Sequence, residues 1–248
     1  MKPIRAIIPA AGKGKRLAKI SGDIPKAMCR VGDRPMLDIV LENLSFIPDE
    51  GIYIVVGCGK EVILEHLGDR YTYVWQQEQL GTGHAVRVCE EHFRDFDGCV
   101  LVTFGDMPLF RREEMEKMCR LHLESGASCT LMTAKNPDLT MWARILRDEK
   151  GKFAAIVEGR DCTEEQAKIT ELFSGVMAFD SRALFELLPE VGCKNAQGEY
   201  YLTEVPELMV RRGLKVETYF TPDGNDLRGV NTPEDLAECE RILASRRG

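Results

Sequence analysis

Near its start the chain reads Ile4-Arg5-Ala6-Ile7-Ile8-Pro9-Ala10-Ala11-Gly12-Lys13-Gly14-Lys15-Arg16-Leu17. Apolar residues give way to small ones after Pro9, as expected where a buried strand ends in a tight loop. A ligand can reach the backbone N–H groups of such a loop, because glycine adopts the positive φ angles that turn them inward. Countercharge would come from Lys13, Lys15, Arg16 and Lys26. The stretch predicts a polyphosphate-binding loop, with a solvated glycine turn as the alternative.

Two familiar phosphate-binding patterns are absent from the sequence. Gly12-x-Gly14 lacks the third glycine of the dinucleotide fingerprint, and no Gly-x-x-x-x-Gly-Lys-Ser/Thr occurs. The predicted second strand ends in Gly57-Cys58-Gly59, which offers no acidic side chain to hold a ribose. These observations argue against a P-loop enzyme and against hydride transfer.

Length and composition indicate an ordinary globular protein. A chain of 248 residues and 27.9 kDa buries on the order of three quarters of its unfolded surface in one core. We therefore expect a single domain over 1–248. The net charge of −7 argues against general nucleic-acid binding, which needs a basic face. A positive pocket around residues 13–30 within an acidic molecule suits a small anionic ligand.

The compartment is predicted from what the sequence lacks. No apolar run reaches the length of a membrane span, and no signal-peptide pattern precedes the first strand, so a cytoplasmic protein is expected. None of the nine cysteines stands in a Cys-x-x-Cys pair, and most have apolar neighbours, which favours reduced core thiols. The four histidines are scattered, which argues against a zinc site.

The rest of the chain alternates strands and helices. Apolar patterns predict strands over 51–56, 71–75, 99–104, 127–134, 144–146, 153–157, 174–179 and 214–220. Helices are expected over 35–44, 62–67, 85–93, 112–125, through 184–188, over 205–212 and from 233. Pro35 suits the first turn of its helix. The strand 99–104 is the most hydrophobic and is expected in the middle of the sheet.

A polar loop, Gln76-Gln77-Glu78-Gln79-Leu80-Gly81-Thr82-Gly83-His84, follows the third strand. A glutamine amide can both donate to and accept from the edge of a pyrimidine, and the backbone at Gly81 can approach closely enough to complete the pairing. The loop thus predicts a base-binding site. By itself Gln76 could also be only a polar strand end, and His84 is interpreted as a residue at the start of a helix.

A carboxylate follows the strand 99–104, in Gly105-Asp106-Met107-Pro108-Leu109. Ligands of open α/β sheets bind beyond the carboxyl ends of the strands, so Asp106 is placed to hold Mg²⁺ on a phosphate. The alternative is an aspartate that only caps a turn. Near the end of the chain, Asn231 precedes Thr232, the expected N-cap of the last helix.

Together these segments resemble the sugar-1-phosphate nucleotidyltransferases, most closely the N-acetylglucosamine-1-phosphate uridylyltransferases that form half of bifunctional enzymes. The motifs are Ala10-Ala11-Gly12-Lys13-Gly14-x-Arg16, Pro25-Lys26, Gln79-Leu80-Gly81-Thr82-Gly83-His84-Ala85, Gly105-Asp106-x-Pro108-Leu109, Gly198-Glu199-Tyr200-Tyr201-Leu202-Thr203 and Gly229-Val230-Asn231. They occur in the family's order and cover nearly the whole chain.

The resemblance implies an α/β, Rossmann-like fold with a mixed, mostly parallel central sheet and helices on both faces. It divides the chain into a nucleotide-binding half over about 1–135, a sugar-binding half over about 136–232 and a C-terminal helix over about 233–246. It implies the reaction of a nucleoside triphosphate, UTP by closest likeness, with a sugar 1-phosphate, which yields a nucleotide sugar and pyrophosphate.

The resemblance also implies roles for individual residues. The nucleotide is expected against Pro9, Ala10, Ala11, Gly12, Gln76, Gly81, Thr82, Phe104 and Gly105. The catalytic residues are expected to be Arg16, Lys26 and Asp106, with Mg²⁺ held by Asp106 and Asn231. The sugar is expected against Ala143, Glu158, Ser174 and Asn231. The physical chemistry agrees with these roles: the attacking phosphate is already ionised at neutral pH, so cations and alignment, rather than a general base, are needed.

Two departures fall in the predicted sugar pocket. Met141-Trp142-Ala143-Arg144 stands where the family has Gly-Tyr-Gly-Arg, and Phe173-Ser174-Gly175 stands where it has Asn-Thr-Gly. Ser174 is shorter than asparagine and lacks its amide, whereas Glu158 matches. N-acetylglucosamine 1-phosphate is therefore one of several hexose 1-phosphates that fit the pattern. No hexapeptide repeat is present, so acetyl transfer is not expected, and monomer and dimer stay open.

Two other functions compete with this prediction. One is a cytidylyltransferase, or another nucleotidyltransferase, with a different phosphorylated acceptor such as phosphocholine. The other is a regulatory protein that binds a nucleotide sugar without catalysis. A sensor would have little need for Arg16, Lys26, Asp106 and Asn231 together.

Overall fold

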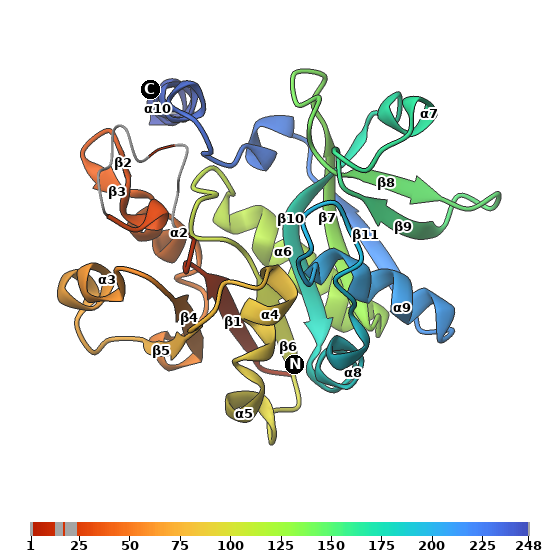
Figure 1. Ribbon diagram of the computed structural model, residues 1–248, viewed down its shortest axis with the longest axis horizontal. Helices are drawn as coiled ribbons and strands as arrows, with labels where there is room; N and C mark the ends of the chain where they lie inside the picture. Colours follow the sequence, from red (N-terminus) through yellow and green to blue (C-terminus); the bar gives the residue numbers. More distant parts are fainter. Residues whose placement is uncertain (1, 13–16, 18–23, 248) are drawn as a thin grey trace.

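The structure is a computed structural model that describes residues 2–12, 17 and 24–247 (Figure 1). Its strands are β1 (Ile4–Pro9), β2 (Arg30–Val31), β3 (Arg34–Pro35), β4 (Ile52–Val56), β5 (Thr72–Trp75), β6 (Cys99–Val102), β7 (Cys129–Lys135), β8 (Arg144–Arg147), β9 (Phe153–Val157), β10 (Glu171–Asp180) and β11 (Val216–Phe220). Its α-helices are α2 (Met36–Asn43), α3 (Lys60–Leu67), α4 (Thr82–Arg87), α5 (Glu90–Phe93), α6 (Arg112–Ser125), α7 (Glu164–Ala167), α8 (Ser181–Leu187), α9 (Val205–Arg211) and α10 (Pro233–Arg247).

In the described part of the chain, nine strands form one mixed sheet, in the order β11-β7-β10-β6-β1-β4-β5, with β8 and β9 attached through β10. β1, β4, β5 and β6 run parallel to one another. β10 runs antiparallel to both β6 and β7, and β11 is parallel to β7. The predicted α/β fold is confirmed, and the apolar strand β6 lies in the middle of the sheet, as its composition predicts.

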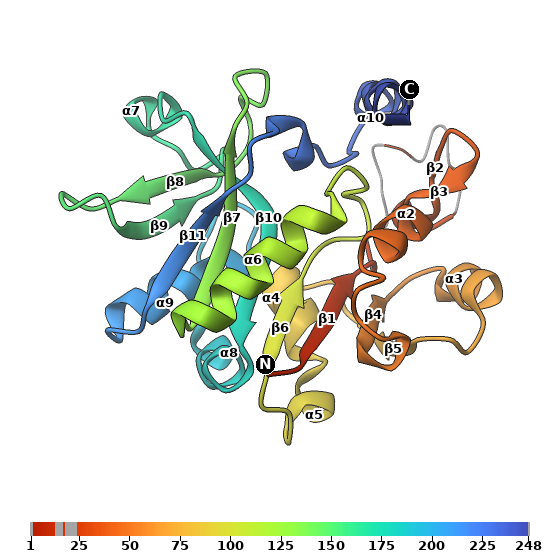
Figure 2. The ribbon, with the colours of Figure 1, turned by 180° about the vertical axis from the view of Figure 1, so that it is seen from behind.

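Helices cover both faces of the sheet, and central strands such as β4 and β6 are buried along their whole length as a result. On the near face in Figure 1, α4, α5, α8 and α9 pack against alternate strand residues such as Ile7 and Val100. Seen from behind, α6 crosses the sheet, and α2 and α3 lie on the same face, against residues such as Ile8 and Leu101 (Figure 2). A third cluster joins α10 to α2 through Cys239, Ile242 and Ile39.

Several predicted elements differ in detail. The helix expected over 85–93 is divided into α4 and α5. The strand expected over 99–104 ends at Val102, and the strand expected over 174–179 extends over the ten residues of β10, with a bulge between Phe173 and Met177. Pro35 does not begin its helix, because it pairs with Arg30 in the hairpin β2–β3 and precedes α2.

The parallel strands place their carboxyl ends at one edge of the sheet. The loops after β1, β4, β5 and β6 therefore meet there, and they approach so closely that a Cβ atom on Gly57 would lie 2.8 Å from that of Ala11. None of the helices in the described residues combines the length and the apolar character that crossing a membrane requires.

Candidate active site

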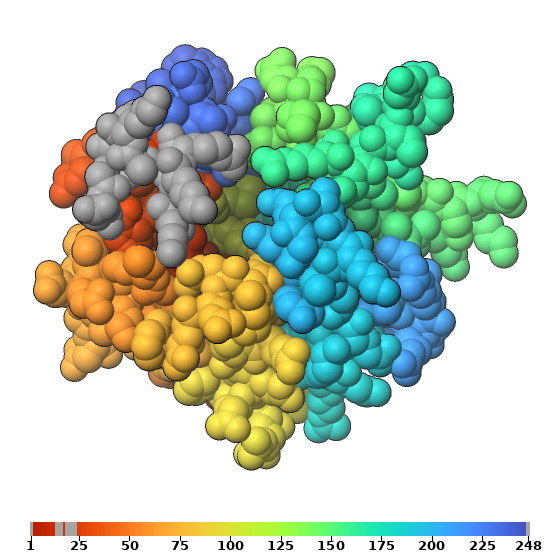
Figure 3. All heavy atoms as spheres, viewed as in Figure 1, coloured from red at the N-terminus to blue at the C-terminus, as the bar shows by residue number. Residues whose placement is uncertain are grey.

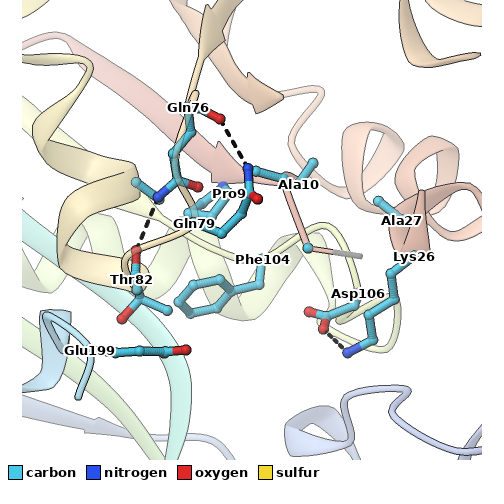
Figure 4. A pocket seen from close by; sticks show the side chains of 14 residues that line it. Pro9, Ala10, Lys26, Ala27, Gln76, Gln79, Thr82, Phe104, Asp106 and Glu199 are labelled. Atoms are coloured by element: carbon cyan, nitrogen blue, oxygen red, sulfur yellow. Dashed lines mark hydrogen bonds and ion pairs between the residues drawn. The ribbon is translucent and has the colours of Figure 1, made fainter. Parts of the chain in front are cut away.

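A cavity of about 250 Å³ opens at the carboxyl edge of β1, β5 and β6 (Figure 4). It is lined by ten of the predicted site residues, Pro9, Ala10, Ala11, Gly12, Lys26, Gln76, Gly81, Thr82, Phe104 and Asp106, and by Ala27, Gln79, Ala85 and Glu199. Figure 3 shows the hollow in this face of the molecule. Gly105 is packed behind the wall, where a Cβ atom would lie 3.0 Å from that of Ala27. Arg16 lies outside the described residues.

At one end of this cavity, two of its lining side chains, Lys26 and Asp106, meet a third polar side chain, Asn231, from a distant part of the chain. The Lys26 ammonium donates to the Asp106 carboxylate and, at 2.9 Å, to the Asn231 amide oxygen. A backbone hydrogen bond from Val230 to the Asp106 carbonyl oxygen, 2.9 Å long, joins the two segments that carry the oxygens. The sheet thus brings residues 26, 106 and 231 to one point.

The donor set at this point fits Mg²⁺. A carboxylate oxygen and an amide oxygen converge on one cationic nitrogen, and Mg²⁺ in nucleotide enzymes takes one or two protein oxygens and completes its shell with phosphates and water. No group of three or more His, Cys, Asp and Glu side chains that could hold a metal occurs among the described residues. That finding is compatible with a site completed by substrate.

The other end of the cavity is formed by the loop after β5. Gln76 is 3 % exposed, and its side-chain amide nitrogen donates to the Gly81 carbonyl oxygen at 3.3 Å and contacts His84 Nδ1 at 3.0 Å. Figure 4 shows the amide oxygen turned from this bond toward the cavity. The amide nitrogen is thus engaged within the protein in this structure, and the expectation that Gln76 pairs with a base stays a prediction.

The loop after β5, residues 76–84, is termed the base-side loop, and a second loop around Tyr200 is hydrogen-bonded to it. The Gly83 N–H donates to the Tyr200 carbonyl oxygen at 2.7 Å, and the Tyr200 N–H donates to the Leu80 carbonyl oxygen at 2.9 Å. The Leu202 N–H donates to Thr82 Oγ1 at 3.0 Å. A Cβ atom on Gly81 would lie 2.6 Å from the Tyr200 carbonyl oxygen, and φ of Gly81 is +113°, so this contact requires glycine.

A larger cavity of about 490 Å³ lies beside the first and shares Thr82, Phe104 and Asp106 with it. The four residues predicted to bind sugar, Ala143, Glu158, Ser174 and Asn231, all line it. The Ser174 hydroxyl accepts from the Val176 N–H at 3.1 Å, so it serves the bulge in β10. Arg144, which follows Ala143, donates to the carbonyl oxygens of Trp142 and Thr140 and fixes this wall.

Glu158 is the acidic residue in the wall of the larger cavity that is predicted to bind the sugar. It accepts a hydrogen bond from Thr203 Oγ1 at 3.1 Å. Burial raises the pKa of this carboxyl above its ordinary value, and the nearby Asp161 acts in the same direction, whereas Thr203 opposes the shift. A carboxylate in such a place suits the hydroxyl groups of a ligand, which donate to it.

Several lining residues carry no predicted role. Glu199 belongs to the first cavity, and Gln197, Leu202 and Thr203 belong to the second. Their signal in the sequence is the segment 198–203, which supports the family resemblance, but nothing in its composition says which ligand it faces. In the structure this segment lies against the base-side loop, to which it is hydrogen-bonded.

Comparison with known proteins gives three kinds of finding: a family profile, curated relatives and a solved structure. The profile of the MobA-like NTP transferase domain matches residues 6–197. The bifunctional protein GlmU of Latilactobacillus sakei subsp. sakei (strain 23K) is 39% identical over 241 residues, 97% of this chain and 52% of that protein. The GlmU of Staphylococcus carnosus (strain TM300) is 36% identical over the same shares. The chain spans about half the length of the curated relatives it matches.

The third finding concerns structure. A crystal structure of UDP-glucose pyrophosphorylase complexed with UDP-glucose superposes with a TM-score of 0.77 and covers 99% of this chain and 100% of that one. Only 18% of the aligned residues are identical, so this likeness shows the fold alone.

Proposed function

The chain belongs to a nucleotidyltransferase family, the MobA-like NTP transferases, and from that premise we propose that it transfers a uridylyl group from UTP to a sugar 1-phosphate, releasing pyrophosphate. N-acetylglucosamine 1-phosphate is the proposed acceptor, with another hexose 1-phosphate as the alternative. The observation that carries the proposal is the meeting of Lys26, Asp106 and Asn231 at the boundary between two cavities.

The proposed reaction is a single displacement at phosphorus. An oxygen of the acceptor phosphate attacks the α-phosphorus of the triphosphate, and the bond from that phosphorus to the β-phosphate oxygen breaks. Pyrophosphate leaves with the electron pair. The attacking oxygen is already ionised at neutral pH, so no residue has to remove a proton. What the protein must supply is alignment and positive charge.

Residues at the two cavities are proposed to supply the positive charge and to hold the metal. Lys26 neutralises phosphate charge, and Asp106 and Asn231 would hold Mg²⁺, which screens the phosphates and lowers the barrier to attack. Arg16 is proposed on its motif alone to assist Lys26.

The residues that line the two cavities support a proposal for where each substrate binds. Pro9, Ala10, Ala11 and Gly12, with Phe104 and Gly105, are proposed to back the nucleotide, and Gln76, Gly81 and Thr82 to surround its base. Ala143, Glu158, Ser174 and Asn231 are proposed to face the sugar. The proposed halves are 1–135 for the nucleotide and 136–232 for the acceptor, with the helix over 233–246 packed beside both.

The test is pyrophosphate release from a panel of the four ribonucleoside triphosphates with several phosphorylated acceptors, each with and without Mg²⁺. We expect pyrophosphate to be released with UTP and a hexose 1-phosphate, and only when Mg²⁺ is present. Preference for CTP with phosphocholine or another acceptor would establish the cytidylyltransferase instead. Tight binding of a nucleotide sugar without turnover would identify a regulatory protein.

A further inference from the structure

Gln76 has a fixed orientation that the proposed function does not explain. Its amide nitrogen lies 3.3 Å from the Gly81 carbonyl oxygen. A carbonyl oxygen only accepts hydrogen bonds, so the amide atom that faces it must be the nitrogen and not the oxygen. The reversed amide would set two oxygens against each other in a nearly closed site.

His84 engages the second N–H of the same amide. Its Nδ1 lies 3.0 Å from the amide nitrogen, and that nitrogen has only hydrogens to offer. Nδ1 must therefore accept, which makes His84 neutral with its proton on Nε2. His84 is the third residue of α4, whose start is clasped by the loop around Tyr200, so the ring is held in place by the helix.

The consequence is a single acceptor that faces the cavity. With both N–H groups engaged, the Gln76 amide presents only its oxygen (Figure 4). At the middle of its pairing edge uracil carries a donor, N3–H, whereas cytosine carries the N3 lone pair, an acceptor. An oxygen fixed opposite this position attracts the first base and repels the second.

We propose that His84 is a positioning residue that locks the Gln76 amide and thereby makes the site select uracil over cytosine. The inference rests on the proposed function for the identity of the ligand and adds a specificity-determining residue to it. His84 does not line the nucleotide cavity, so it acts through Gln76 and not by contact with the base.

Two substitutions separate positioning from packing. His84→Asn keeps an accepting oxygen close to the place of Nδ1, whereas His84→Leu fills similar space without an acceptor. Loss of one buried hydrogen bond lets the amide rotate, so the Leu variant is expected to lower the ratio of kcat/KM for UTP to that for CTP about 10-fold. The Asn variant should stay within about 3-fold of the wild-type ratio. His92→Leu, on the exposed side of α5, is the matched control and should leave the ratio unchanged.

An unchanged ratio in the Leu variant, or an equal loss in Leu and Asn, would overturn the proposal. Nitrogen NMR of the wild-type protein tests it without a variant: the expected His84 tautomer carries its proton on Nε2, and a proton on Nδ1 would contradict the assignment.

Calorimetric binding of UTP and CTP without acceptor separates this proposal from the proposed function. If no acceptor is turned over but UTP binds more tightly than CTP, and the Leu variant loses that preference, the transferase fails and the role of His84 stands. A wild-type protein that binds CTP as tightly as UTP, or binds neither, overturns the role of His84.

Discussion

Lys26 occupies the position of the proposed divalent cation, because its ammonium contacts both the Asp106 carboxylate and the Asn231 amide oxygen. Removing this charge takes away a competitor for the same oxygens. We predict that Lys26→Gln raises the affinity of the free protein for Mn²⁺ about 5-fold, while it lowers kcat by about 10²-fold through the loss of phosphate neutralisation. Electron paramagnetic resonance titration with Mn²⁺, without nucleotide, measures the first effect.

Asp106→Ala is the control for this experiment. It removes the carboxylate, so Mn²⁺ binding should be lost, and kcat should fall by about 10²-fold or more although the fold survives. Weaker Mn²⁺ binding in the Lys26→Gln variant would show that the ammonium supports the cation site and does not compete for it.

Glu158 gives a prediction about pH. Burial raises its pKa in the folded protein, so the ionised form costs stability wherever the pH exceeds the ordinary glutamate range. This cost is absent in acid, where the folded and unfolded states are both protonated. It grows as the pH rises from the ordinary glutamate pKa of the unfolded chain to the raised pKa of the folded protein, and it is constant above that. Glu158→Gln should therefore raise the unfolding midpoint at pH 8, and the difference should vanish below about pH 4.

The same substitution should impair function. A neutral amide accepts hydrogen bonds from sugar hydroxyls less strongly than a carboxylate, so kcat/KM for the acceptor should fall about 10-fold while KM for UTP stays unchanged. Thermal unfolding at several pH values and acceptor kinetics check the two parts. A variant that is less stable at pH 8 would contradict the account of Glu158.

At the scale of elements, the clasp between the loops around Gly81 and Tyr200 links the two cavities. Gly81→Ala places a Cβ atom 2.6 Å from the Tyr200 carbonyl oxygen and demands a left-handed backbone, so the loops must separate. We predict that KM rises about 10-fold for both UTP and the acceptor. Steady-state kinetics with each substrate varied in turn gives the measurement.

Gly213→Ala is the matched control, because Gly213 also has a positive φ of +71° but no atom within 4 Å of the added Cβ. The Gly213→Ala substitution introduces backbone strain without a steric clash, and Gly213 lies at the end of α9 and lines neither cavity. If both variants changed KM alike, general destabilisation rather than the clasp would be the cause.

The elements also show what the sequence predicts well. α6 begins at Arg112 and ends at Ser125, as its apolar spacing indicates, because a long amphipathic helix on a sheet has one favourable arrangement. The prediction of one continuous helix over 85–93 is wrong. The apolar face continues across a turn at Val88 and Cys89, so periodicity does not detect the break. The extra length of β10 depends on β7 and β8 beside it, which is tertiary information.

The sequence predicts which residues belong to the candidate site, but not the contacts between their side chains. Asp106 could be placed from strand order, because carboxyl ends of parallel strands converge. The orientation of the Gln76 amide depends on His84, whose sequence position suggests only a helix start. The meeting of Lys26 with Asn231, separated by 205 residues, requires the complete sheet and the docking of α10.

At the scale of the whole molecule, a buried ionic network ties α10 to the rest of the protein. Asp226 is 0 % exposed and accepts hydrogen bonds from Arg111, Arg246 and Thr221 at 2.9, 2.8 and 2.8 Å. Arg246 also donates to the Leu109 carbonyl oxygen at 2.7 Å. The network joins the end of α10 to the segment after β11 and to the start of α6, so it fixes the helix across the sheet edge.

α10 also holds a proposed metal ligand at its other end. The N–H groups of Asn231 and Thr232 donate to the Asp235 carboxylate at 2.8 and 2.9 Å, and the Asp235 N–H donates to Thr232 Oγ1. This reciprocal cap makes the position of Asn231 depend on where the first turn of α10 lies. We therefore expect the docking of the helix and the formation of the proposed cation site to be coupled.

Arg246→Met tests this coupling. Asp226 keeps Arg111 and Thr221 but loses one charged hydrogen-bond partner, which should lower the free energy of unfolding by about 2 kcal/mol in urea titrations. Because α10 then docks less firmly, Mn²⁺ affinity should also fall, by about 3-fold. Arg241→Met is the matched control, since within the described residues that guanidinium pairs with Glu238 on the exposed surface of the same helix. Its effect on the free energy of unfolding and on Mn²⁺ affinity should be small.

A loss of stability in Arg246→Met with unchanged Mn²⁺ affinity would contradict the coupling. It would mean that Asn231 is held by its own cap alone, and that the proposed cation site does not depend on the far end of α10.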